Sequence, residues 1–116
     1  MSSPTTRSLV YIRNQGYIAS ITERWNPFAH IRQDLFNFID IIGFNIERKE
    51  FVGIQTTSQS NVSARIEKVK GISDALHWLQ AGGKIYVHGW ALKGKAGTRK
   101  TWKVTVREIT LKDFNR

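Results

Sequence analysis

The feature that most constrains the fold of this chain is an apolar segment, residues 35–44, that carries a single carboxylate. Its even positions are Phe36, Phe38, Asp40, Ile42 and Phe44. Period-two alternation predicts a β-strand, and it places Asp40 on one face with aliphatic and aromatic side chains. A buried, ionised carboxylate is costly unless a metal ion or a cation compensates it. Asp40 is therefore either a metal ligand or one half of a salt bridge to Arg32 or Arg24.

Helix and strand signals precede this segment. Ser3 followed by Pro4 is typical of a helix start, and Gly16 of a helix end. Residues 17–23 then alternate as a strand that ends at Glu23. Residues 25–33 are expected to form a loop or a short helical turn.

The second half of the chain predicts further strands around one helical region. Residues 51–57 form a strand in which Gln55 and Thr57 face the same side. A helical stripe follows from Val62 to Leu79, with a kink or a break at Gly71. Strands at 84–92 and 100–110 are joined by a Gly- and Lys-rich turn. The expected architecture is one α/β domain over residues 1–116, with a mixed central sheet flanked by helices and the order α-β-β-β-α-β-β.

Composition excludes several classes of protein. The chain has 116 residues and no cysteine, so neither a disulfide framework nor a thiolate metal site is available. No apolar run approaches the roughly 20 residues of a membrane span. Residues 1–7 lack the pattern of a secretion signal. We therefore expect a cytoplasmic protein that does not contact a membrane.

The charge of the chain points to a polyanionic partner. The formal net charge is +9, and the segment from residue 84 to residue 107 contains basic residues but no acid. These are Lys84, Lys93, Lys95, Arg99, Lys100, Lys103 and Arg107. Binding to nucleic acid would release condensed counterions, which favours association. The alternative is a basic surface that serves solubility.

Oxygen donors lie about fifteen residues after Asp40, on the neighbouring expected strand. The Asp40 carboxylate, the Gln55 side chain and the backbone carbonyl of Thr56 together offer hard ligands to Mg²⁺ or Mn²⁺. His88 is a possible general base, although a lone histidine in a strand more often has a structural role. Trp90 and Trp102 are candidates for base stacking or, alternatively, for core packing.

Two segments joined by a polar turn resemble the catalytic hairpin of the PD-(D/E)XK nucleases. They are Phe38-Ile39-Asp40-Ile41-Ile42-Gly43-Phe44 and Val52-Gly53-Ile54-Gln55-Thr56-Thr57-Ser58. The similarity is greatest to the Holliday-junction-resolvase-like branch of that superfamily. The resemblance covers most of the chain, because the order of helices and strands is also similar. It implies a restriction-endonuclease-like fold.

The resemblance also implies roles for individual residues. Asp40 takes the place of the metal-binding Asp, Gln55 that of the second acidic ligand, and Thr57 that of the usual lysine. A neutral Gln weakens Mg²⁺ binding, and the missing ammonium requires a replacement such as Arg65 or Lys68, or else activity is weak or lost. The acid that the family carries on its first helix has Glu23 as its substitute here, with Asp34 as a second candidate.

The function implied is Mg²⁺-dependent hydrolysis of DNA phosphodiester bonds, on branched or otherwise structured DNA, by a homodimer. Expected nucleic-acid contacts are Arg32, Ser58, Asn61, Arg65, Lys68, Lys93, Lys95, Arg99 and Lys100. A nucleic-acid-binding module that has this fold but no catalytic activity is the main alternative. An unrelated basic interaction domain is the third, and it would require Asp40 to be salt-bridged and remote from any cleft.

Overall fold

Five strands form one mixed β-sheet in the computed structural model, which describes residues 3–114. Met1 and Ser2, part of the segment in which no secretion signal is expected, lie outside the described residues. The strand order is β1-β4-β5-β6-β7, and only β5 and β6 pair in parallel among these neighbours. The strands are β1 (Ile18–Ile21), β4 (Ile41–Asn45), β5 (Glu50–Ser58), β6 (Lys84–Lys93) and β7 (Thr101–Ile109).

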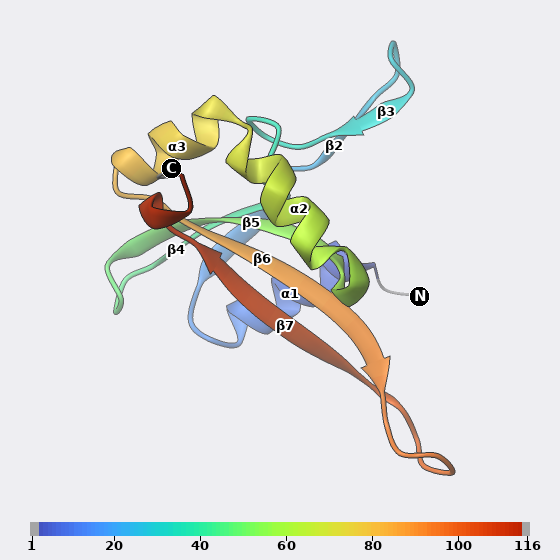
Figure 1. Cartoon of the computed structure of the whole chain (residues 1–116). Helices are drawn as coiled ribbons and strands as arrows, with labels where there is room; N and C mark the ends of the chain where they lie inside the picture. Colours follow the sequence, from blue (N-terminus) through green and yellow to red (C-terminus); the bar gives the residue numbers. More distant parts are fainter. Residues whose placement is uncertain (1–2, 115–116) are drawn as a thin grey trace.

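Helices cover both faces of the sheet (Figure 1). Helix α1 (Pro4–Arg13) packs on one face, and α2 (Val62–Lys70) and α3 (Ser73–Gln80) form the crossover between the parallel strands on the other. Short 3₁₀ turns, η1 (Gln59–Asn61) and η2 (Leu111–Phe114), complete the described elements. The expected α/β class with a mixed sheet flanked by helices is confirmed.

Local signals explain where the helices begin and end. The Ser3 hydroxyl accepts a hydrogen bond from the Thr6 amide at the start of α1, as the cap pattern predicts. Gly71 ends α2, and α3 starts two residues later, so the glycine breaks the helical stripe rather than bending it. Among the described residues, no helix combines the length and apolar character needed to cross a membrane.

Two apolar clusters lie on opposite faces of the sheet. The cluster under α1 contains Ile12, Tyr17, Ala19, Ile41, Val52 and Ile54. The cluster under α2 and α3 contains Phe38, Ile39, Val62, Val69, Ala75, Ile85, Val87 and Ile109. Neighbouring β5 residues contribute to different faces, so Thr56 lies on the α1 side and Gln55 on the α2 side.

The expected strand at residues 35–44 is wrong in its first half. Only Ile41–Asn45 is strand, and the preceding residues form a tight turn in which Phe36 and Asn37 have φ of 53° and 69°. The Asn37 amide donates to the Asp34 carbonyl, and Leu35 and Ile39 pair as an isolated antiparallel bridge. Asn tolerates the left-handed region better than most residues. Asp40 is thus not on a strand face with Phe36 but at the bend where β4 begins.

The expected loop at residues 25–33 is also corrected, because it forms a second, two-stranded sheet. Strands β2 (Arg24–Asn26) and β3 (Ile31–Gln33) pair antiparallel and project from the body of the protein. The β6–β7 hairpin projects separately, with its loop far from the sheet centre (Figure 1). The molecule therefore has two extended hairpins.

A polar contact on the α1 side joins the first helix to β6. The Ser8 hydroxyl, fully buried, lies 2.9 Å from His88 Nδ1 and accepts a hydrogen bond from Trp90 Nε1 at 2.8 Å. Burial lowers the pKa of His88 from 6.5 to about 4. The structure therefore gives His88 a structural position in the core, and Trp90 is a core residue as well.

We predict that His88 makes the protein less stable in mild acid. Its folded pKa lies below the unfolded value, so the stabilisation is fully present above pH 6.5 and is lost as pH falls toward 4. Between pH 7 and pH 5 the free energy of unfolding, measured with urea, should fall by about 2 kcal/mol less in His88→Gln than in wild type. His77→Gln, at an exposed position on α3, is the control for the loss of an imidazole from the surface. Equal slopes for wild type and His88→Gln would contradict the prediction.

Candidate active site

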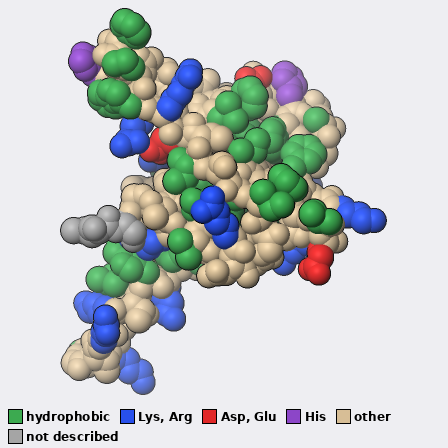
Figure 2. All heavy atoms as spheres, turned by 180° about the vertical axis from the view of Figure 1, so that it is seen from behind, with side chains coloured by type: hydrophobic (Ala, Val, Ile, Leu, Met, Phe, Trp, Pro, Cys, Tyr) green, Lys and Arg blue, Asp and Glu red, His purple; other side chains and the backbone are tan. Residues whose placement is uncertain are grey.

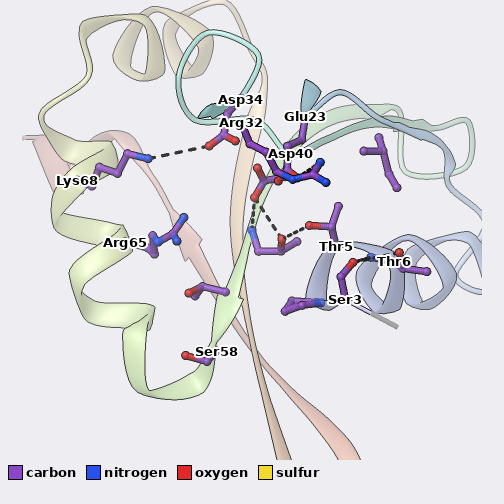
Figure 3. A pocket seen from close by; sticks show the side chains of 14 residues that line it. Ser3, Thr5, Thr6, Glu23, Arg32, Asp34, Asp40, Ser58, Arg65 and Lys68 are labelled. Atoms are coloured by element: carbon purple, nitrogen blue, oxygen red, sulfur yellow. Dashed lines mark hydrogen bonds and ion pairs between the residues drawn. The ribbon is translucent and has the colours of Figure 1, made fainter. Parts of the chain in front are cut away.

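The turn that precedes β4 brings three carboxylates together. Asp34 and Asp40 lie on either side of the Leu35–Ile39 bridge, and Glu23 follows the end of β1. One carboxylate oxygen of each lies within 4.8 Å of the others. In an extended strand, six residues would separate Asp34 from Asp40 by about 20 Å. The turn therefore creates the cluster (Figure 3).

Main-chain hydrogen bonds hold this turn against both neighbouring strands. The Asp40 amide donates to the Ile54 carbonyl of β5 at 2.8 Å. The Thr22 amide donates to the Asp40 carbonyl at 2.8 Å, and the Thr22 hydroxyl to the Ile39 carbonyl. The ends of β1 and the turn are thus fixed to each other, which also fixes Glu23 beside Asp40.

One carboxylate oxygen of Asp40 accepts a set of hydrogen bonds from β5. Gln55 Nε2 donates to Asp40 Oδ2 at 2.6 Å, the Thr56 amide at 2.8 Å and the Thr56 hydroxyl at 3.2 Å. Gln55 Nε2 also donates to Asp34 at 3.2 Å. Asp40 is 2% exposed and Gln55 is fully buried. The pairing of Asp40 with Gln55 expected from the sequence is therefore present.

Gln55 leaves one buried oxygen without a partner. Its Oε1 accepts no hydrogen bond from any described residue, although the side chain is fully buried. An unpaired buried acceptor is destabilising by about 1–3 kcal/mol. Rotation of the amide by half a turn would exchange Oε1 and Nε2. Such a rotation would present an oxygen to the two carboxylates.

The electrostatics of the cluster favour a protonated carboxyl. Burial is the main cause that raises the pKa of Asp40 from 3.8 to about 7, and the hydrogen bond and charge of Asp34 act in the same direction. The Thr56 amide and Gln55 oppose this rise by donating to the carboxylate. Neighbouring carboxylates that share a site behave in this way unless a cation is bound between them.

The cluster lies in a cavity of about 740 Å³. Asp34, Asp40 and Glu23 form one end, and Arg65 and Lys68 of α2 line the opposite side (Figure 3). Lys68 Nζ lies 4.0 Å from Asp34 Oδ2. Thr57 lines the same cavity without contributing a charge. Lys68 of α2 therefore places near Asp34 a positive charge that Thr57 does not supply.

The first turn of α1 closes the remaining side of the cavity. Ser3, Pro4, Thr5 and Thr6 line it, and the Thr5 and Thr56 hydroxyls lie 2.7 Å apart. A helix N-terminus carries unpaired amides and a partial positive charge, which favour anions. Helix α1 therefore contributes hydroxyl-bearing residues, and no acid, to the cavity that contains the carboxylates.

Other predicted site residues fall into two groups. Arg32 and Ser58 line the cavity, as do Arg65 and Lys68. The remaining predicted contacts do not line it: Asn61 is exposed at the start of α2, and Lys93, Lys95, Arg99 and Lys100 are exposed on the β6–β7 hairpin.

The alternative in which Asp40 forms a salt bridge is not supported by the geometry. Arg32 pairs with Glu23 at 3.2 Å instead, and neither Arg32 nor Arg24 forms an ion pair with Asp40 in the part of the chain that the structure describes. Asp40 also lines the cavity rather than lying away from it. Both conditions for the third alternative, an unrelated basic domain with a remote, salt-bridged Asp40, are therefore absent.

Two features of the site were underestimated from sequence. Asp34 was a second candidate behind Glu23, yet both belong to the cluster. The first turn of α1 was not expected at the site. The Asn37 residue between two acids was a turn signal within an otherwise strand-like pattern, whereas the approach of α1 depends on long-range packing.

Comparison with known proteins adds no relative: no protein-family model, no curated protein and no solved structure matches the chain. The conclusions on function therefore depend on the geometry of the site.

We predict that Asp40→Asn stabilises the protein at high pH. Because the folded pKa lies above the unfolded value, ionisation of Asp40 opposes folding between about pH 4 and pH 7, and this cost is fully present above pH 7. The Asn oxygen can still accept from Thr56, while its amide replaces the proton shared with Asp34. The Tm in EDTA should therefore rise at pH 8 and change little at pH 4.

The control for this measurement is Glu47→Gln, which removes an exposed carboxylate in the β4–β5 turn. A Tm of Asp40→Asn well below that of wild type at pH 8 would instead identify Asp40 as the partner of a buried cation, whose loss is strongly destabilising.

Proposed function

We propose that this chain is a divalent-metal-dependent DNA endonuclease with a restriction-endonuclease-like fold of the PD-(D/E)XK class. The observation that carries the proposal is the cluster of Glu23, Asp34 and Asp40, of which Asp40 is buried and the other two are partly exposed, in a cavity that basic side chains also line. Grouping carboxylates around a buried one raises the energy of the metal-free protein. Such an arrangement is characteristic of functional sites.

The donor set fits a hard divalent cation such as Mg²⁺ or Mn²⁺. Asp40, Asp34 and Glu23 supply carboxylate oxygens, and a half-turn of the Gln55 amide would add a neutral oxygen ligand. The Thr56 carbonyl remains a proposed additional ligand. When bound, the cation would polarise the scissile phosphate and lower the pKa of a coordinated water.

Basic side chains around the cluster would position the DNA. Lys68 and Arg65 point into the cavity from α2 (Figure 3), where an ammonium or guanidinium can bind phosphate oxygens. Lys68, close to Asp34, is the best replacement for the lysine that the family has at the position of Thr57.

The exposed basic residues of the β6–β7 hairpin extend this surface. Lys93, Lys95, Arg99 and Lys100 lie in or beside its loop, and Figure 2 shows Lys and Arg side chains along the projecting hairpin. Charges at such a distance from the cavity can bind the backbone of a duplex without reading its sequence. A homodimer that acts on branched or structured DNA follows from the family resemblance and remains part of the proposal.

The catalytic proposal is tested by Mn²⁺ binding and DNA cleavage. Wild type should bind Mn²⁺ in calorimetry and cut DNA, whereas Asp40→Asn should lose both and keep its DNA affinity in EDTA within about twofold. Gln55→Glu adds a negative ligand and should tighten Mn²⁺ binding by roughly tenfold or more. Asp74→Asn, which removes an exposed acid of α3, should behave as wild type.

The alternative is a nucleic-acid-binding module with the same fold and no catalysis. The neutral Gln55 and Thr57 favour it, because they replace an acid and a lysine. DNA binding by wild type without Mn²⁺ binding, and without cleavage even in Gln55→Glu, would support this module and contradict the nuclease proposal.

A separate prediction concerns how DNA is held. Lys95→Gln/Lys100→Gln should weaken duplex binding at low salt and reduce the slope of log affinity against log salt by about 0.9 per lost phosphate contact. Lys49→Gln/Lys112→Gln removes the same charge from exposed positions in the β4–β5 turn and in η2. Equal losses in the two double variants would mean that net charge, not the β6–β7 hairpin, determines binding.

A further inference from the structure

The β2–β3 hairpin exposes a set of large apolar side chains that the core does not use. Phe28, at its tip, is 94% exposed, and Trp25 and Ile31 are 54% and 50% exposed. Figure 2 shows hydrophobic side chains gathered at the end of this hairpin. Exposed clusters of this kind usually mark an interaction site.

The tip of the hairpin is held in a defined shape. Asn26 Oδ1 accepts hydrogen bonds from the amides of Phe28 and Ala29 at 2.9 and 3.1 Å. His30 adopts a left-handed φ of 54°, and its ring lies edge-on to Trp25 with centroids 6.2 Å apart. The side chain of Phe28 therefore projects from an ordered turn rather than from an unstructured loop.

The register of the hairpin places Trp25 on the face that belongs to the active-site cavity. Trp25 pairs directly with Arg32, and directly paired residues of an antiparallel ribbon share a face. Arg32 lines the cavity and pairs with Glu23 of the carboxylate cluster. Arg24 pairs with Gln33 and lines a different hollow. Trp25 and the cavity-lining Arg32 therefore lie on the same face of the hairpin.

We propose that Trp25 and Phe28 stack on unpaired nucleobases beside the bond that is cut. This inference rests on the proposed nuclease function and specifies its substrate: DNA with single-stranded nucleotides joined to a duplex, rather than DNA in which every base is paired. The faces of paired bases are covered by their neighbours in the helix, so exposed aromatic side chains gain a stacking partner only where the strand is unpaired.

The charges around the hairpin favour this occupant over a second copy of the chain. Arg32 lies opposite Trp25 on the same face of the hairpin, and an arginine beside an aromatic ring suits a nucleotide, with its phosphate and its flat base. Two copies of this hairpin, each with Arg24 and Arg32, would bring like charges together, so their direct association is opposed by repulsion.

The test compares three DNAs of equal length in EDTA: a blunt duplex, the same duplex with a single-stranded tail, and a fully paired four-way junction. Wild type should bind the tailed duplex most tightly by fluorescence anisotropy. Phe28→Ala and Trp25→Ala should each weaken binding of the tailed duplex by roughly 5- to 100-fold, with little change for the blunt duplex. A 2-aminopurine in the tail should be quenched by wild type and less by the variants.

Ile46→Ala is the matched control, because Ile46 is 73% exposed on the β4–β5 turn and lies outside both proposed surfaces. Equal affinity for the three DNAs, unchanged in Phe28→Ala, would overturn the inference while Mn²⁺-dependent cleavage still supported the nuclease. Failure to bind any of them at low salt would overturn both. A wild-type dimer that Phe28→Ala converts to a monomer, with DNA preference unchanged, would assign the hairpin to self-association instead.

Discussion

The hydrogen bonds to one oxygen of Asp40 are the interaction on which the rest of the site depends. They connect the turn before β4 to the Gln55 side chain and the Thr56 backbone of β5. Without them, the turn would have only its main-chain contacts to fix it, and the acids would have no defined separation. Charge-assisted hydrogen bonds of this kind are shorter and stronger than neutral ones. They offset part, though not all, of the cost of burying the carboxyl.

The part of the free-energy cost of burying Asp40 that these hydrogen bonds do not offset is seen in two properties of the cavity. The raised pKa of Asp40 expresses burial and the nearness of Asp34, and the partnerless Gln55 oxygen adds a further destabilising term. The cost of grouping the carboxylates would be relieved by a cation among them. The basic side chains of α2 line the same cavity, and Lys68, 4.0 Å from Asp34, offsets part of the negative charge of the cluster.

The sequence predicted most of the sheet and the nearness of Asp40 to Gln55. Capping at Ser3, the alternation of β5 and the basic run over β6 and β7 are local signals, so their elements could be found without the fold. The error at residues 35–44 has a clear cause: Phe38 and Ile39 are buried from a turn, and burial produces the same apolar pattern as a strand. The β2–β3 hairpin was missed because its apolar residues face outward and do not alternate with a core.

By itself, the sequence determined the α/β class, the excess of positive charge and the nearness of Asp40 to Gln55, because these follow from composition and from patterns within one or two elements. Only the tertiary structure decided that Glu23 and Asp34 both join Asp40, that Lys68 faces them from α2, and that Trp25 shares a face with Arg32. The first two relations depend on a left-handed turn at Phe36 and Asn37 and on the packing of α2 on the sheet, and the third depends on the register of the β2–β3 hairpin. A turn reverses the direction of the chain within a few residues, so it determines which distant side chains meet, and no hydrophobic period records it.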